Sequence, residues 1–230
     1  QVVEGLSAMT GDRVEALPAD PAGTEDILAA IDDETSCVVV QSPSFYGQLI
    51  DLKPIAEKAH AHGALLIAVF TEVVSLGLIE APGEQGADIV VGEGQSIGNG
   101  LNFGGPYVGL FATRQKIIRQ MPGRLCGETV DAGGKRGFVL TLSTREQHIR
   151  REKATSNVCT AQALLAVMAS MYAVFHGPKG LQAIAQRIHR KAVRLAKGLE
   201  EAGFKVDPQA FFDTITVDVG PLQAAVMKSA

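Results

Sequence analysis

Four short apolar runs in the first half of the chain have continuous rather than alternating hydrophobic positions. Continuous runs are typical of strands covered on both faces, as in a mostly parallel sheet. We therefore expect buried strands over residues 37–41, 64–69, 87–91 and 107–112.

The segments between these runs have helical spacing. Residues 52–62 place Leu52, Ile55 and Ala59 on one face, and Gly63 is expected to end that helix. Shorter helices are expected over 26–31 and 114–120. Strands that alternate with helices predict an α/β fold.

The pattern changes after residue 144. Residues 160–176 contain no charged side chain, which predicts a buried helix, and Gly177 with Pro178 should break it. A second helix is expected over 180–202, followed by a strand over 214–219. We accordingly predict a large domain over residues 1–180 and the start of a small α+β C-terminal domain over 181–230.

Composition narrows the function classes. The 230 residues are 46% hydrophobic and 20% charged with a net charge of -4, which argues against disorder and gives no global reason to bind nucleic acid or an anionic membrane. No apolar run reaches the roughly 20 residues of a membrane span. Three scattered cysteines, with Cys37 expected to be a buried thiol, suit a reducing cytoplasm. The chain starts at Gln1, not Met, and we treat it as a fragment.

Two segments and the histidines are candidates for chemistry. Residues 92–100 (GEGQSIGNG) offer a glycine-rich loop, but no amphipathic helix follows it, so packing at a domain interface is favoured over nucleotide binding. Residues 145–153 hold four basic residues interleaved with glutamates, which favours a solvated or interface helix over contacts with an anionic site in a neighbouring subunit. The five histidines lack metal-ligand spacing, so each is expected to be a surface or capping residue.

Several longer motifs resemble one family, the glycine decarboxylases of the glycine cleavage system. They are QSPSFYG (41–47), GEGQSIG (92–98), FGGP (103–106), MPGR (121–124) and TREQHIRREKATSN (144–157). The resemblance is closest to subunit 1, the α subunit, of the two-subunit bacterial form, and it covers nearly the whole chain.

This resemblance implies a fold, a reaction and partners. The fold would be that of the fold-type-I pyridoxal-phosphate enzymes. The reaction would be decarboxylation of glycine, with pyridoxal phosphate as the electron sink and the lipoyl H-protein as acceptor of the aminomethyl group. Subunit 1 would pair with subunit 2 (β) in an α2β2 assembly.

The chain departs from the pattern of a complete pyridoxal-phosphate site. Aligned on the family landmarks, the aspartate that would face the pyridine nitrogen falls on Val69, and the Schiff-base lysine falls on Gln95. No lysine occurs between Lys58 and Lys116, so a small register error cannot restore it. Valine cannot stabilise a pyridinium and glutamine is not nucleophilic. This departure agrees with the resemblance, which implies that the β subunit carries the cofactor.

The role left for this chain is to complete the site and the assembly. Arg150, Arg151, Thr155, Ser156 and Asn157 are expected near the α/β interface, either close to β's cofactor phosphate or the H-protein channel, or only joining α to β. Two alternatives are a self-sufficient pyridoxal-phosphate enzyme, which the missing aspartate and lysine oppose, and a scaffold protein that kept the fold without catalysis.

Overall fold

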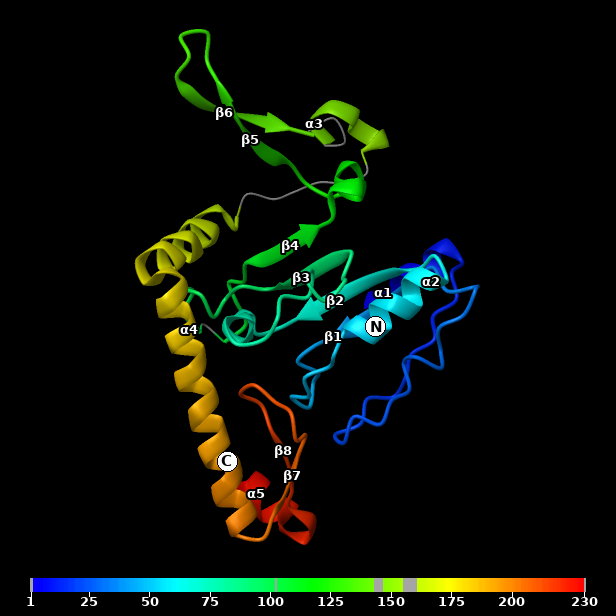
Figure 1. Ribbon diagram of the computed structural model, residues 1–230, viewed down its shortest axis with the longest axis vertical. Helices are drawn as coiled ribbons and strands as arrows, with labels where there is room; N and C mark the ends of the chain where they lie inside the picture. Colours follow the sequence, from blue (N-terminus) through cyan, green and yellow to red (C-terminus); the bar gives the residue numbers. More distant parts are fainter. Residues whose placement is uncertain (1, 102, 143–146, 155–160, 230) are drawn as a thin grey trace.

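A four-stranded sheet forms the centre of the computed structural model, which describes residues 2–101, 103–142, 147–154 and 161–229 (Figure 1). Its order is β1–β2–β3–β4; the first three strands are parallel and β4 is antiparallel to β3. The positions of the predicted strands and the mostly parallel sheet are thus confirmed, but the expected burial is wrong for β3 and β4, neither of which contains a buried residue. The bounds are Cys37–Gln41 (β1), Leu65–Phe70 (β2), Ile89–Glu93 (β3) and Gly109–Thr113 (β4).

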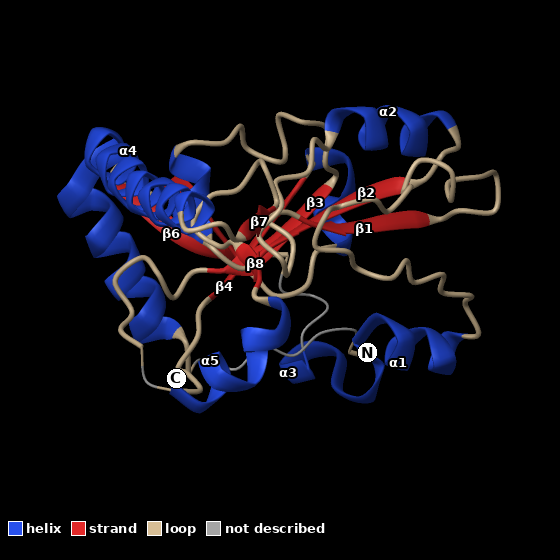
Figure 2. Ribbon diagram, turned by 90° about the horizontal axis from the view of Figure 1, so that it is seen from below, coloured by secondary structure: helices blue, strands red, loops and turns tan. Residues whose placement is uncertain are grey.

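Helix α2 (Lys53–Ala61) covers one face of this sheet (Figure 2). Its Ile55 and Ala56 pack with Leu66 and Ala68 of β2 in one buried cluster, as the helical spacing predicts. Full burial of an isoleucine or leucine side chain, such as Ile55 or Leu66, stabilises the fold by about 1.5–3 kcal/mol. The helix ends before Gly63, whose φ of 75° suits a residue without Cβ.

Two expectations for the helices and cysteines are wrong. Residues 27–30 form a single turn and not a helix: the Asp26 carboxylate caps it by accepting from the Ala29 N–H (2.9 Å), but the segment is too short to propagate a helix. Cys37 is exposed, because it opens β1, which pairs only with β2 among the described strands. The segment expected to be helical over 114–120 is a 3₁₀ helix, Gln115–Gln120.

The shorter helices lie before, between and after these elements along the chain. Their bounds are Val2–Thr10 (α1), Val73–Gly77 (η1), Gln147–Arg150 (α3), Arg151–Lys153 (η4), Gly220–Leu222 (η5) and Gln223–Ser229 (α5). None of the described helices has both the length and the apolar composition that crossing a bilayer requires.

A hairpin of β5 (Leu125–Val130) and β6 (Arg136–Thr141), which was not predicted, projects beyond the sheet (Figure 1). Its turn is closed by the Asp131 carboxylate, which accepts hydrogen bonds from the N–H groups of Gly133 (2.8 Å) and Lys135 (2.9 Å). Asp131 before the Gly133–Gly134 pair is the signal that could have predicted this turn.

Helix α4 (Ala163–Glu201) runs along one side of the molecule. The predicted break is present: Gly177 has the non-helical angles φ 62° and ψ 176°. The residues before it and the residues after it are helical. The expectation that the first half is buried is wrong in this chain. Apart from Ala169, its apolar side chains are largely open, and Phe175 is 84% exposed.

A C-terminal unit is built from β7 (Lys205–Asp207) and β8 (Thr216–Asp218), with β8 inside the strand predicted over 214–219. The QSPSFYG segment and the residues after it join this unit to the sheet. The Leu49 N–H donates to the Ala210 carbonyl (3.0 Å), and the Thr216 hydroxyl donates to the Tyr46 carbonyl (3.3 Å). The domain boundary near residue 180 stays a prediction.

Candidate functional site

The carboxyl ends of β1, β2 and β3 lie at one edge of the sheet, because the three strands are parallel and in register. Gln41 pairs with Val69, and Val69 pairs with Val91. Ligands of open α/β sheets bind outside this edge, which we call the carboxyl edge. It consists of the residues that end and follow β1 (41–44), β2 (69–72) and β3 (93–96).

Val69 and Gln95, the two positions singled out from the sequence, both belong to the carboxyl edge. Val69 is half-buried and lies on the face of β2 opposite to the buried Ala68 and Phe70. The Gln95 amide nitrogen donates to the carbonyls of Gly100 (3.3 Å) and Pro106 (3.4 Å). The Gln95 side chain therefore holds the following loop in place.

Two carboxylates stand beside them at this edge. Glu72 accepts hydrogen bonds from the Val74 N–H (2.8 Å) and from the Ser96 hydroxyl (2.8 Å). Glu93 accepts from the N–H groups of Gln95 (2.9 Å) and Val108 (3.0 Å). Both carboxylates thus accept hydrogen bonds from backbone N–H groups that could otherwise bind an anion. Both also add negative charge to the carboxyl edge.

These residues do not fit a covalently held pyridoxal phosphate. A phosphate requires cationic or N–H donors, whereas this edge presents Glu72 and Glu93. A Schiff base requires a lysine, and the sequence has none from residue 59 to 115, which includes every residue that follows β2 and β3 at this edge. No carboxylate stands at Val69 to pair with a pyridinium.

The glycine-rich loop after β3 packs against the first half of α4, which belongs to the predicted large domain, so packing at a domain interface stays a prediction. A Cβ on Gly98 would lie 2.9 Å from the Cβ of Tyr172 and 3.2 Å from the Met168 carbonyl oxygen. Gly98 also has φ 93°, a conformation that favours glycine. Asn99 is buried, and its amide nitrogen donates to the Leu165 carbonyl (3.4 Å). These glycines allow the loop and the helix to approach closely.

The predicted interface residues are only partly described. Arg150 ends α3 and Arg151 begins η4, and both are exposed on the segment between the hairpin and α4, not on the carboxyl edge. Thr155, Ser156 and Asn157 lie outside the described residues. Whether these five residues act together stays a prediction.

A buried charge that the sequence did not reveal lies at the opposite edge of the sheet. Asp88 immediately precedes β3 and is 1% exposed. Its carboxylate contacts Lys116 Nζ (2.9 Å) and His60 Nε2 (2.7 Å) and accepts from the Leu66 N–H (3.1 Å). Burial would raise the pKa of Asp88, but the hydrogen bonds from Lys116 and His60 outweigh it and lower the pKa to about 2.

The Asp88 cluster is structural and not catalytic, since it lies at the amino ends of the parallel strands and every group in it is paired. Among the described histidines, His60 is the one that contacts Asp88. His62 pairs with Asp33 (2.6 Å), and His189 contacts the Phe212 carbonyl (2.8 Å). Within the part of the chain that the structure describes, no three His, Cys, Asp or Glu side chains are grouped so as to hold a metal ion.

Comparison with known structures defines the class of protein. The fold is that of the fold-type-I pyridoxal-phosphate enzymes: a cystathionine gamma-lyase from Lactobacillus plantarum, crystallised with L-serine, superposes with a TM-score of 0.56 over 96% of this chain and 52% of its own, at 14% sequence identity. A crystal structure of glycine decarboxylase (P-protein) in inhibitor-bound form superposes with a TM-score of 0.84, at 45% identity over 92% of this chain and 48% of its own.

The family follows from the sequence. Residues 1–230 match the model of the glycine cleavage system P-protein, and the chain belongs to that family. Two relatives named "Probable glycine dehydrogenase (decarboxylating) subunit 1" are 66% identical over 220 residues in Azorhizobium caulinodans and 61% identical over 230 residues in Xanthobacter autotrophicus. They are matched over 95% and 99% of this chain, but over only 49% and 52% of their own length. The chain thus spans about half the length of these relatives.

Proposed function

We propose that this chain is part of subunit 1 of a glycine dehydrogenase (aminomethyl-transferring, decarboxylating), and that it contributes to catalysis only within an assembly. The family membership and the relatives named subunit 1 support the reaction. The split of roles between the subunits is supported by the carboxyl edge, where the proposal assigns Val69 and Gln95 to the positions of the two groups that the cofactor requires.

In this proposal, pyridoxal phosphate is held by subunit 2 (β). The cofactor supplies the electron sink for decarboxylation when bound there. The carboxyl edge of this chain supports that assignment because Glu72 and Glu93 would repel a phosphate at close range. Removing an aspartate and a lysine from a site without cofactor also avoids two desolvated charges.

The partners of the assembly are subunit 2, in an α2β2 complex, and the lipoyl H-protein that accepts the aminomethyl group. The word "subunit" in the names of the relatives supports a second chain. We further propose a cytoplasmic location, which the free and exposed thiols of Cys37 and Cys126 support.

Borohydride trapping tests whether subunit 2 alone holds pyridoxal phosphate. Full-length subunit 1, alone and assembled with subunit 2, is incubated with pyridoxal phosphate and reduced, and phosphopyridoxyl-lysine is mapped by peptide mass spectrometry. We expect the label on subunit 2 only. A specifically labelled lysine in subunit 1 alone would overturn the assignment of Val69 and Gln95.

The role of Arg150 and Arg151 is tested by the Arg150→Ala/Arg151→Ala double variant in the assembled enzyme. If these guanidinium groups reach the anionic site of subunit 2, glycine decarboxylation should fall by at least about tenfold, the loss of one charge-assisted contact. Sedimentation of the complex is the control for assembly. Unchanged turnover with unchanged assembly would reject the functional role, and a loss of assembly alone would assign both residues to the subunit contact.

A further inference from the structure

The carboxyl edge is built from sequence without cations. From residue 59 to residue 113 the chain has five acidic residues and no lysine or arginine. Residues 42–52, which follow β1, contain no lysine or arginine either. The segments that follow β1, β2 and β3 can therefore contribute only negative charge to this edge.

Two of these acidic residues, Glu72 and Glu93, belong to the carboxyl edge, and we call them the carboxylate pair. Both side chains are partly buried. Elsewhere in the same stretch, Glu80 and Asp88 form ion pairs with lysines. Among the described residues, no ion pair includes Glu72 or Glu93. The negative charge of the pair is therefore not compensated by a described basic side chain.

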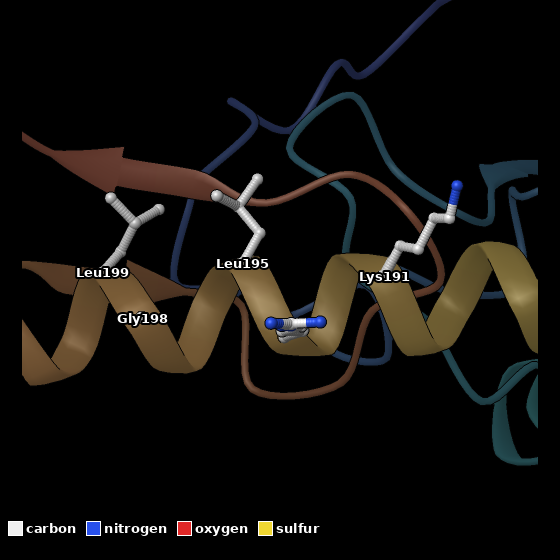
Figure 3. A pocket seen from close by; sticks show the side chains of 5 residues that line it. Lys191, Leu195, Gly198 and Leu199 are labelled. Carbon is white, nitrogen blue, oxygen red and sulfur yellow. The ribbon is translucent and has the colours of Figure 1, made fainter.

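Basic side chains gather in another part of the chain, on the second half of α4, where residues 187–197 hold five of them. Figure 3 shows Lys191 on the same side of this helix as Leu195 and Leu199, where it lines a shallow hollow of about 420 Å³. Within the described part of the chain, none of these cations forms an ion pair with the carboxylate pair. The two kinds of charge are thus kept apart.

The hydrogen bonds of the carboxylate pair do not require its charge. The pair accepts from three backbone N–H groups and from the Ser96 hydroxyl. The side-chain oxygen of a glutamine can accept the same N–H bonds, and the Ser96 hydroxyl can also accept a bond from a glutamine amide. The charge of Glu72 and Glu93 is therefore not explained by the local structure that these residues support.

Carboxylates without a cationic partner act on any charged molecule that approaches them. Like charges repel over the Debye length, about 8 Å at physiological ionic strength, and partly buried charges are screened less than exposed ones. A phosphate group with two negative charges is repelled more strongly than a group with one, and a neutral molecule of similar shape is not repelled. The carboxylate pair should therefore discriminate between ligands by their charge.

We propose that the carboxylate pair excludes anionic ligands, pyridoxal phosphate among them, from the carboxyl edge of this chain. The exclusion acts on the phosphate group and is separate from the lack of a lysine for a Schiff base. A lysine at position 95 would therefore not by itself make this edge a site for the cofactor. The inference rests on the proposed function, in which subunit 2 holds pyridoxal phosphate and this chain does not compete for it.

The test introduces an amine at the carboxyl edge by the Gln95→Lys substitution in full-length subunit 1 without subunit 2. The variant is treated in parallel with pyridoxal phosphate and with pyridoxal, which lacks the phosphate, and is then reduced with borohydride. Peptide mass spectrometry gives the ratio of the phosphorylated to the unphosphorylated label at position 95. Because both aldehydes react with the same amine, effects of the carboxylates on its reactivity cancel in this ratio.

Addition of Glu72→Gln/Glu93→Gln to this variant should raise the ratio at least about fivefold, because only the phosphate is repelled by the pair. High salt should raise the ratio in Gln95→Lys alone and should have little effect once the pair is neutral. The matched control adds Glu34→Gln/Glu84→Gln, which removes equal charge at exposed positions before β1 and β3. It should change the ratio less than about 1.5-fold, since these residues lie toward the opposite edge.

A second position for the amine separates exclusion from folding. Thr71 is exposed and directly precedes Glu72, so Thr71→Lys leaves the Gln95 hydrogen bonds intact. Thermal unfolding shows which variants are folded. A ratio that is unchanged by Glu72→Gln/Glu93→Gln at either position of a folded variant would overturn the inference, as would an equal rise in the control. The proposed function fails separately, if a native lysine of subunit 1 is specifically labelled or the complex does not decarboxylate glycine.

Discussion

Asp88 shows how one buried charge is retained without a catalytic role. Its carboxylate is removed from water, which alone would favour the neutral acid. Lys116, His60 and the Leu66 N–H compensate by direct contacts. Because Lys116 approaches from the segment after β4 and His60 from α2, the cluster fixes these segments to the start of β3. Its contribution is therefore to stability and not to the reaction.

Stability should follow the titration of Asp88. Its pKa is lowered from 3.8 to about 2 in the folded chain, so the carboxylate stabilises the fold above about pH 4. That contribution, about 2 kcal/mol, should be lost as the pH falls from about 4 to about 2. Urea unfolding of full-length subunit 1 across this range should show the loss.

The Asp88→Asn variant is the control for that titration. It should lower the free energy of unfolding at pH 7 by about 2–3 kcal/mol, because the ion pairs are lost while Lys116 and Arg114 stay partly solvated. It should also lose part of the decline in stability between pH 4 and 2. If the free energy of unfolding of the variant declines between pH 4 and 2 as steeply as that of the wild type, the acid sensitivity belongs to other carboxylates.

The sequence could place Val69 and Gln95 at one edge, because strand ends follow from local apolar runs. It could not reveal the Asp88 cluster, since residues 60, 88 and 116 meet only through the sheet register. The functional meaning of Val69 and Gln95 came from a family resemblance and stays a prediction. Arg150 and Arg151 lie away from the carboxyl edge, and their role at the interface stays a prediction.

At the scale of elements, the QSPSFYG segment connects the sheet to the C-terminal unit. The Gln48–Phe211 bridge and the Leu49 and Tyr46 hydrogen bonds join the two parts. Gly47 lies at the closest approach: a Cβ there would lie 2.0 Å from the Thr214 carbonyl oxygen, and its φ is 93°. Both the space and the backbone conformation require glycine.

Gly47→Ala should therefore destabilise full-length subunit 1 by more than about 2 kcal/mol, from left-handed strain plus displacement of the Thr214 backbone. Gly63→Ala is the matched control, because Gly63 has φ 75° but nothing within 4 Å of its Cβ position. It should cost only about 1 kcal/mol. Denaturant unfolding of both variants measures the difference, and equal losses would show that the close contact is relieved at no cost.

Elements were predictable where local pattern decides them. The continuous apolar runs predicted all four sheet strands, and Gly177 with Pro178 predicted the kink of α4. The burial of α4 was not predictable, because an uncharged helix indicates that some surface covers it but not whether the same chain supplies that surface. The hairpin was missed because its two strands are mostly exposed, so that their apolar pattern is weak.

At the scale of the whole molecule, the first half of α4 exposes an apolar face, and the chain spans about half the length of the relatives that it matches. Val174 and Phe175 are 77% and 84% exposed, beside Val167 and Met171 on the same half-helix. Such contiguous apolar surface is uncommon on a free protein. We expect it to be covered in the assembled enzyme.

The Val174→Ser/Phe175→Ser variant measures how much stability the covering of this apolar face contributes. In the assembled enzyme it should lower stability by roughly 2–4 kcal/mol, the apolar transfer energy of the two side chains. Leu222→Ser in η5, where Leu222 is 50% exposed, is the control. Thermal unfolding of full-length subunit 1 alone and in complex shows whether its own chain or subunit 2 supplies the cover. An unchanged stability both in free subunit 1 and in the complex would refute the prediction that this apolar face is covered.

The kink in α4 has a mechanical consequence. The helix is a stiff rod on both sides of Gly177, with one half seated against the glycine-rich loop and the other against the C-terminal unit through His189 and Phe212. Among the described residues, the segment 46–49 also contacts that unit, and the second half of α4 packs against η1, where Gly77 approaches Ala185. We expect a displacement of the C-terminal unit to reach the loop that contains Gln95 through α4, which contacts that loop at Gly98.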